Sequence, residues 1–259
     1  MDQLPKQLEA SLTDLLLSIA DDKFILGHRN ADWTGLGPML EEDIAFASLA
    51  QDDLAHAMGL YEMIAGFSGG RADAIAYGRT PEQYRCAQLV ELSDEFDWSV
   101  AIARQFFCDH FDQLRLGRLA SSNYKPLRDL AARLFAEERL AIGHADQWVV
   151  RLGKGGDDAR GRMQAALTRL APLATALFEP TAGVEQLESA GIYPRGTADM
   201  YDQWESAIEN VVEAATLELS LPRADFLKPA GRRGVRSNEF AALHTEMTEV
   251  YRVEPEASW

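Results

Sequence analysis

Five ionisable residues fall on the apolar faces of long segments with helical periodicity. They are Lys23, Asp53, His56, Asp109 and Glu138, and each lies three or four residues from apolar neighbours in its segment. Asp53 and His56 are three residues apart, so a helix directs both to the same side. Because a buried charge is costly unless it is paired or bound to a metal, we expect these side chains to meet inside one bundle.

The chemistry that this spacing suggests is a two-metal carboxylate centre. Such a centre takes a carboxylate from each of two helices and Glu-x-x-His from the other two, because two hard cations must be bridged and neutralised. Asp53 and His56 form one such pair, but Ala141 stands where a second histidine should be, and Lys23 stands where a carboxylate should be. His144 lies off that helix face. The pattern predicts a degenerate metal site held by ion pairs between Lys23 and the carboxylates.

The elements that must position these groups are helices. Apolar residues recur with helical spacing, and almost no alternating pattern is present. Seven helices are predicted, at about 6–30, 39–66, 92–120, 125–152, 158–178, 197–220 and 238–253, with a short helix start at Thr80-Pro81-Glu82. The first four are far longer than the usual ~11–12 residues. We therefore expect a single all-α domain over 1–259, with a four-helix bundle of long helices at about 6–152 and additional C-terminal helices at about 157–253.

Composition excludes several classes of protein. The 259 residues include 25 Lys and Arg against 41 Asp and Glu, a formal net charge of −16. This balance disfavours nucleic acid and anionic membranes as partners, since both require clustered positive charge. With 47% hydrophobic residues, the chain can build a core and is not disordered.

Cysteines and terminal segments indicate a reducing compartment. Cys86 and Cys108 both lie in periodic apolar context, so we expect them to be reduced core residues. No signal peptide and no run long enough to span a membrane is recognisable. We therefore expect a cytoplasmic protein.

A basic loop stands out in this acidic chain. The Pro222 to Arg236 stretch separates the last two predicted helices, and its cations are Arg223, Lys228, Arg232, Arg233 and Arg236. Converging guanidinium groups could face a partner or the phosphates of an acyl-CoA. A short basic cluster has no unique meaning, so a solvated surface loop is the alternative.

Several motifs together resemble the phenylacetic acid catabolic protein family, the ferritin-like subunits of the multicomponent phenylacetyl-CoA epoxidase. The resemblance covers nearly the whole chain, from about Leu12 to Trp259. The motifs that carry it are Gln51–Ala57, Ala103–Phe107 with Asp109, Arg151–Gly153, Leu243–Met247 and the terminal Trp259.

The resemblance implies a structural rather than a catalytic role. In this family the catalytic subunit has an intact di-iron site, and a homologous structural subunit pairs with it. The positions that match the di-iron ligands are Lys23, Asp53, His56, Asp109, Glu138 and Ala141. The departures at Lys23 and Ala141 imply no catalytic residue and no cofactor in this chain, with di-iron in its partner.

The implied partners are the catalytic subunit and other members of the complex, including a flavin and iron–sulfur reductase; a second copy of this chain is the alternative in isolation. We expect the interface on the first two long helices, where Leu17, Ile25 and Leu36 lie off the core stripe. Two other functions stay open: a catalytic di-iron oxygenase with unusual ligands, and a stand-alone helical interaction protein. Metal content and co-purification with a second ferritin-like chain separate these alternatives.

Overall fold

The computed structural model describes residues 4–222 and 230–257, and these form helices joined by turns and loops. No strand occurs in these two ranges. The predicted all-α, ferritin-like helical fold is therefore confirmed. Arg223, Lys228 and Trp259 lie outside the described residues.

Contacts along the chain define two compact units, which are described separately. The α1–α2 unit contains the described residues of 9–93, 181–183 and 230–257. The α5–α6 unit contains those of 4–8, 94–180 and 184–222. The single domain over 1–259 stays a prediction.

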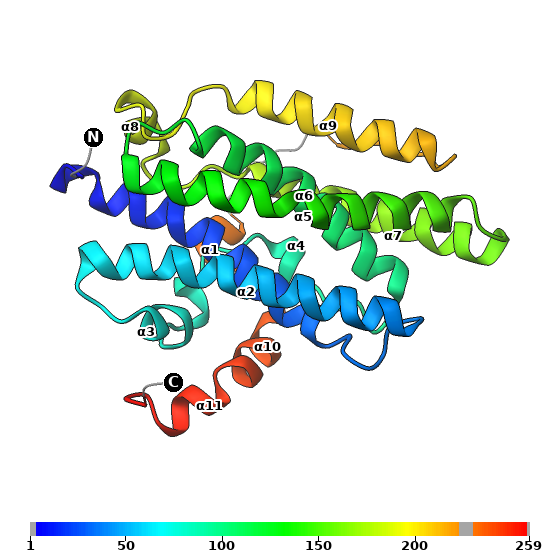
Figure 1. Cartoon of the computed structure of the whole chain (residues 1–259), viewed down its shortest axis with the longest axis horizontal. Coiled ribbons are helices and arrows are strands. Elements are labelled where there is room, and N and C mark those ends of the chain that lie inside the picture. The colour runs from blue at the N-terminus through cyan, green and yellow to red at the C-terminus, as the bar shows by residue number, and fades with distance from the viewer. Residues whose placement is uncertain (1–3, 223–229, 258–259) are drawn as a thin grey trace. The chain divides into compact units, whose positions relative to one another are not determined.

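The α1–α2 unit is built on a hairpin of two long helices, α1 (Glu9–Ala31) and α2 (Leu40–Ser68), which run side by side in Figure 1. The helices approach closely at Gly27. A Cβ atom at Gly27 would lie 2.9 Å from the Cγ of Leu54 and 3.1 Å from the backbone oxygen of Ala50. Glycine at this position therefore allows the two backbones to pack.

Short elements complete this unit. They are α3 (Ala72–Tyr77), η2 (Pro81–Gln83), α4 (Gln88–Glu91), η4 (Gly231–Arg233), α10 (Phe240–Met247) and α11 (Glu249–Val253). The predicted helix start at Thr80-Pro81-Glu82 is present as η2, where the Thr80 backbone N–H donates to Oε1 of Gln83 at 2.8 Å. The predicted helix at 238–253 is divided at Thr248, whose hydroxyl donates to the backbone oxygen of His244 at 2.6 Å.

The α5–α6 unit contains α5 (Trp98–Leu119) and α6 (Lys125–Gly153), followed by α7 (Asp157–Thr175), η3 (Ala176–Phe178), α8 (Val184–Ser189) and α9 (Thr197–Ala214), with η1 (Lys6–Leu8). Helix α5 contacts α6, α7 and α9. Trp204 of α9 is fully buried against Phe107 of α5, and its indole N–H donates to the Phe107 backbone oxygen at 3.2 Å. This aromatic contact fixes α9 along α5.

Helix boundaries differ from the predicted ones where residues adopt positive φ. The third long helix begins at Trp98 rather than near 92, because Glu95 and Phe96 have φ of 52° and 58°. The sixth ends at Ala214 rather than 220, because Thr216 has φ of 58°. These left-handed conformations interrupt a right-handed helix. The short helices α3 and α8 were not predicted.

The structure corrects one residue of the predicted interface. Ile25 is fully buried, whereas Leu17 is half-buried and Leu36 is 55% exposed. Helix α1 contacts both α2 and α4, and the backbone N–H of Ala87, just before α4, donates to Asp22 of α1. Because α1 is covered on more than one side, Ile25 is buried although it lies off the predicted core stripe. Cys86 and Cys108 are both buried and are not joined in a disulfide, as predicted. No helix within the described ranges is long and apolar enough to cross a membrane.

Candidate functional site

A buried ion pair joins the two long helices of the α1–α2 unit. The Nζ atom of Lys23 on α1 lies 3.0 Å from Oδ1 of Asp53 on α2, and the two side chains are 1% and 6% exposed. The side-chain amide of Asn30 donates to the other carboxylate oxygen at 3.3 Å. The predicted pairing of Lys23 with Asp53 is therefore present, and nitrogen donors contact both oxygens of Asp53.

His56 follows one helical turn after Asp53, as the spacing predicted. Both residues are 4% exposed and belong to the buried face of α2. The α1–α2 unit thus holds three of the six positions in its interior: one cation, one carboxylate and one imidazole.

The other three positions lie in the α5–α6 unit. Asp109 on α5 is fully buried and Glu138 on α6 is 2% exposed. The side-chain amide of Gln105 donates to Oδ1 of Asp109 at 2.5 Å. Ala141, at 9% exposure, faces inward but offers no ligand atom. That all six positions meet in one bundle stays a prediction.

The donor set does not suit a metal ion at Asp53. A metal would need lone pairs that the carboxylate already shares with Lys23 and Asn30, and the lysine ammonium would repel a cation. Within either unit, no three His, Cys, Asp or Glu side chains of described residues are placed to hold a metal ion. The residues around Asp53 therefore do not fit a metal centre.

A second buried carboxylate on α1, Asp21, was not predicted from the sequence. Arg79 donates to both of its oxygens, at 2.9 and 2.5 Å, and the Tyr61 hydroxyl donates to Oδ1 at 2.6 Å. The backbone N–H of Arg85 also donates to this carboxylate, at 2.6 Å. Burial and the nearby negative charge raise the pKa of Tyr61 well above its ordinary value, so the phenol stays protonated and donates.

Asp22, the next residue, holds Arg232 of the basic loop. The guanidinium makes two bonds of 2.7 Å to the carboxylate and also donates to the Ser18 backbone oxygen at 2.8 Å. Arg232 is 1% exposed. This bidentate geometry is the strong form of an arginine–carboxylate contact, and it ties η4 to the middle of α1.

Arg236 forms an ion pair with Glu91 of α4. Its Nη1 lies 2.6 Å from Oε1 of Glu91, and its side chain is 8% exposed. The backbone N–H of Ser237 donates to the other glutamate oxygen at 2.7 Å. Burial raises the pKa of Glu91, although Arg236 opposes that effect. Burial likewise raises the pKa of the adjacent Cys86 thiol, so this cysteine is not an activated nucleophile.

These contacts correct the prediction for the basic loop. Arg232 and Arg236 bind carboxylates of their own unit and do not face a partner or a CoA phosphate. Arg233 is exposed, and its contact with a partner or CoA stays a prediction. Arg223 and Lys228 lie outside the described residues. One feature of the sequence could have indicated this internal pairing. Asp21-Asp22-Lys23 is a charged run flanked on both sides by apolar residues of α1, so its carboxylates need cations from elsewhere in the fold.

The α5–α6 unit also contains buried ion pairs that were not predicted. Arg104 lies 2.9 Å from Asp94, and its side chain is fully buried. Arg115 pairs with Asp112 one turn away on α5, and both side chains are 3% exposed. Both described units thus contain buried charges that are paired with an opposite charge, and such pairing lowers the cost of burying them.

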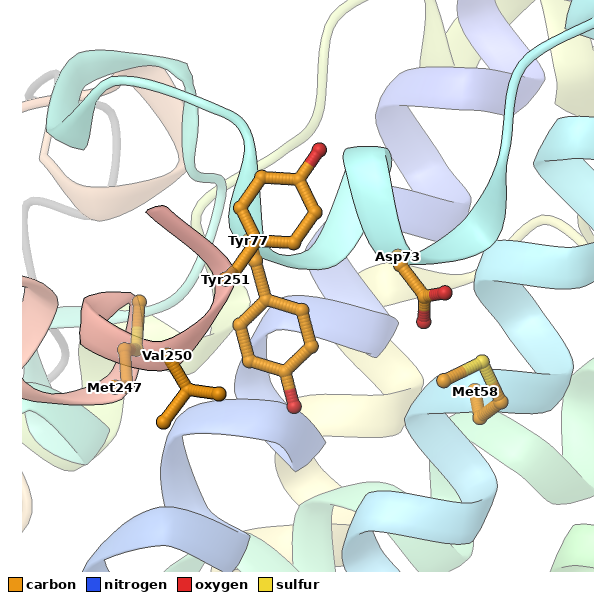
Figure 2. A pocket seen from close by; sticks show the side chains of 6 residues that line it. All are labelled: Met58, Asp73, Tyr77, Met247, Val250 and Tyr251. Atoms are coloured by element: carbon orange, nitrogen blue, oxygen red, sulfur yellow. The ribbon is translucent and has the colours of Figure 1, made fainter. Parts of the chain in front are cut away.

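A cavity of about 420 Å³ lies among α2, α3, α10 and α11 of the α1–α2 unit. Figure 2 shows its lining, with the rings of Tyr77 and Tyr251 between Met247 and Val250 on the left and Asp73 and Met58 on the right. The two rings stack with centroids 5.8 Å apart. Met58, Met247 and Val250 complete the wall. Burial, and then the charge of Asp73, raise the pKa of Tyr77. This cavity suits an apolar group and disfavours an anion such as a CoA phosphate.

Comparisons with known proteins cover both units. The family model described as "Phenylacetic acid catabolic protein" matches residues 1–259. Among curated proteins, the chain is 28% identical over 251 residues to a subunit of the 1,2-phenylacetyl-CoA epoxidase of Escherichia coli (strain K12). That similarity covers 96% of this chain and 99% of the relative.

Proposed function

The chain belongs to the phenylacetic acid catabolic protein family, and from this membership we propose that it is the structural, non-catalytic member of a phenylacetyl-CoA ring-epoxidising monooxygenase complex. The curated relative from Escherichia coli is itself a subunit of such an epoxidase. Its similarity runs over almost the full length of both chains, which supports a corresponding place in a corresponding complex.

The observation that carries this proposal is the Lys23–Asp53 ion pair. Lys23 places a cation 3.0 Å from the carboxylate that a di-iron centre would need as a ligand. Ala141 provides no donor where an imidazole should be. Oxygen activation needs a redox metal or an organic cofactor, so chemistry in the complex falls to another subunit.

The residues of this chain then act as a scaffold. Lys23, Asp53 and Asn30 fix the register of α1 against α2, which is a recognised role of buried polar contacts in bundles. In the complex, the partner is a homologous di-iron catalytic subunit in the cytoplasm, and a flavin and iron–sulfur reductase supplies the electrons.

Reconstitution tests the proposal. The catalytic partner and the reductase should oxidise phenylacetyl-CoA poorly without this chain and well with it. Turnover by this chain with reductase alone would instead make it a catalytic di-iron oxygenase with unusual ligands. If the catalytic partner turned over phenylacetyl-CoA equally well without this chain, the remaining interpretation would be a stand-alone helical interaction protein.

A further inference from the structure

Figure 1 shows the turn that joins α1 to α2 at one end of the hairpin. This turn and the start of α2 carry exposed apolar side chains. Leu36 is 55% exposed, Leu40 is 70% exposed and Ile44 is 64% exposed. Leu40 and Ile44 are one helical turn apart, so their side chains are neighbours on the surface of α2. Scattered apolar side chains on a surface are ordinary, but a contiguous group with a polar border marks an interaction site.

The patch is held in a fixed shape by the loop below it. Trp33 is 3% exposed and its ring lies 6.4 Å from that of Phe46 on the inner side of α2. The Gly37 backbone N–H donates to Oδ1 of Asp43 at 2.6 Å. A Cβ at Gly37 would lie 2.7 Å from that oxygen, so a larger residue there would displace the Asp43 carboxylate from this hydrogen bond. Leu36 is thereby kept beside the first turn of α2, and little conformational entropy remains to be lost on binding.

The segment that carries the patch has acidic residues and no Lys or Arg. Helix α2 contains no Lys or Arg along its whole length, and the sequence has none between Arg29 and Arg71. The same interval contains seven acidic residues, Asp32, Glu41, Glu42, Asp43, Asp52, Asp53 and Glu62. Of these, Asp53 is buried with Lys23, and Glu41 is exposed next to Leu40 in the sequence, at the border of the patch. Asp52 and Glu62 are exposed further along α2.

This combination identifies the chemistry of the occupant. A surface that is apolar at its centre and acidic at its border is complementary to apolar side chains bordered by Lys and Arg. A second copy of this chain is disfavoured, because an isologous contact would bring the same acidic border against itself in a chain of net charge −16.

We propose that Leu36, Leu40 and Ile44, with the lysine- and arginine-free face of α2, form the docking surface for an apolar, cation-bordered surface of a different protein chain. For the identity of that chain the inference rests on the proposed function, which makes it the catalytic subunit of the epoxidase. The patch replaces the predicted interface of Leu17, Ile25 and Leu36, of which Ile25 is buried.

The experiment measures the affinity of the full-length chain for the purified catalytic subunit by titration calorimetry. A Leu40→Ser, Ile44→Ser double variant should raise the dissociation constant about 100-fold, about tenfold for each apolar side chain removed from the contact. The matched control is Leu140→Ser with Val253→Ser, which removes two side chains that are 81% and 83% exposed elsewhere. The control should bind like the wild type. Circular dichroism and melting temperature should be unchanged in both double variants, since all four side chains are exposed.

A charge variant tests the border separately. Glu41→Lys should weaken the complex, and raising ionic strength from about 0.05 M to about 0.5 M should weaken the wild-type complex more than that of the variant, because salt screens the acidic border.

The outcomes separate the two proposals. Wild-type affinity in the Leu40→Ser, Ile44→Ser variant, or equal loss in the control, overturns the docking surface and leaves the proposed function standing. No complex with the wild-type chain overturns both. Conversion of a wild-type homodimer to monomer by the double variant assigns the patch to a second copy and overturns the inference of a different chain.

Discussion

The Nζ atom of Lys23 lies 3.0 Å from Oδ1 of Asp53, and this contact crosses from one long helix to the next with both side chains buried. The residues are 30 positions apart in the sequence and come together because α1 and α2 form a hairpin. A lysine and a carboxylate in contact satisfy each other's charge without a metal, which is why this one pair bears on both stability and function.

Replacing Lys23 with methionine should destabilise the protein. The methionine keeps the stem length but leaves the buried Asp53 carboxylate without its cation, at a cost of about 3–5 kcal/mol in the free energy of unfolding. Urea denaturation measures the change. The control is Lys125→Met, which removes a lysine that is 55% exposed and paired with Asp129 and should cost at most about 0.5 kcal/mol. An equal free energy of unfolding in urea for Lys23→Met and the wild type would contradict a structural role for the pair.

Purified protein should retain little iron after anaerobic loading and desalting. The physical reason is the Lys23 ammonium beside Asp53 and the absence of a ligand atom at Ala141. Elemental analysis gives the metal content, and about two irons per chain, the content of an intact di-iron centre, would contradict the prediction. Lys23→Glu combined with Ala141→His supplies the two missing ligand types and should raise the iron content above that of the wild type.

Arg232 and Arg233 are adjacent in the sequence, but the Arg232 side chain is buried and the Arg233 side chain is exposed. Arg232→Met should lower the free energy of unfolding by about 3–5 kcal/mol, because it leaves the buried Asp22 carboxylate without its bidentate partner. Arg233→Met changes an exposed side chain and should stay within about 0.5 kcal/mol of the wild type. Equal effects of the two substitutions would show that Arg232 does not hold η4 to α1.

Stability should fall as pH falls from 6.5 towards 4, in part through His28. Burial and the neighbouring Arg29 lower the pKa of His28 from 6.5 to about 4, and its Nε2 has no hydrogen-bond partner within the described ranges. Between these two values the unfolded chain binds a proton that the folded chain does not, so protonation favours unfolding. From pH 7.5 to pH 5 this amounts to up to about 2 kcal/mol.

Urea denaturation of His28→Gln at both pH values isolates the contribution of this residue. The variant should lose less stability than the wild type on acidification, and the difference between the two losses is the quantity that the pKa predicts. The same loss in both proteins would assign the pH dependence to other groups.

The sequence by itself determined the helical class, the long helices and the inward position of Lys23 and Asp53. These follow from the spacing of apolar residues along one segment, since a helix turns every 3.6 residues and a residue's face is fixed by its near neighbours. The same local rules placed Asp53 and His56 on one side of α2.

Only the tertiary structure decided the partners of Asp21 and Asp22, the inward position of Arg232 and the burial of Ile25. Asp22 and Arg232 are 210 residues apart, and no local pattern links a helix to a loop at that distance. The run Asp21-Asp22-Lys23 points in three directions around α1, so each charge has to be paired by a different neighbour, and which neighbour covers each side of a helix is fixed by the packing of distant segments.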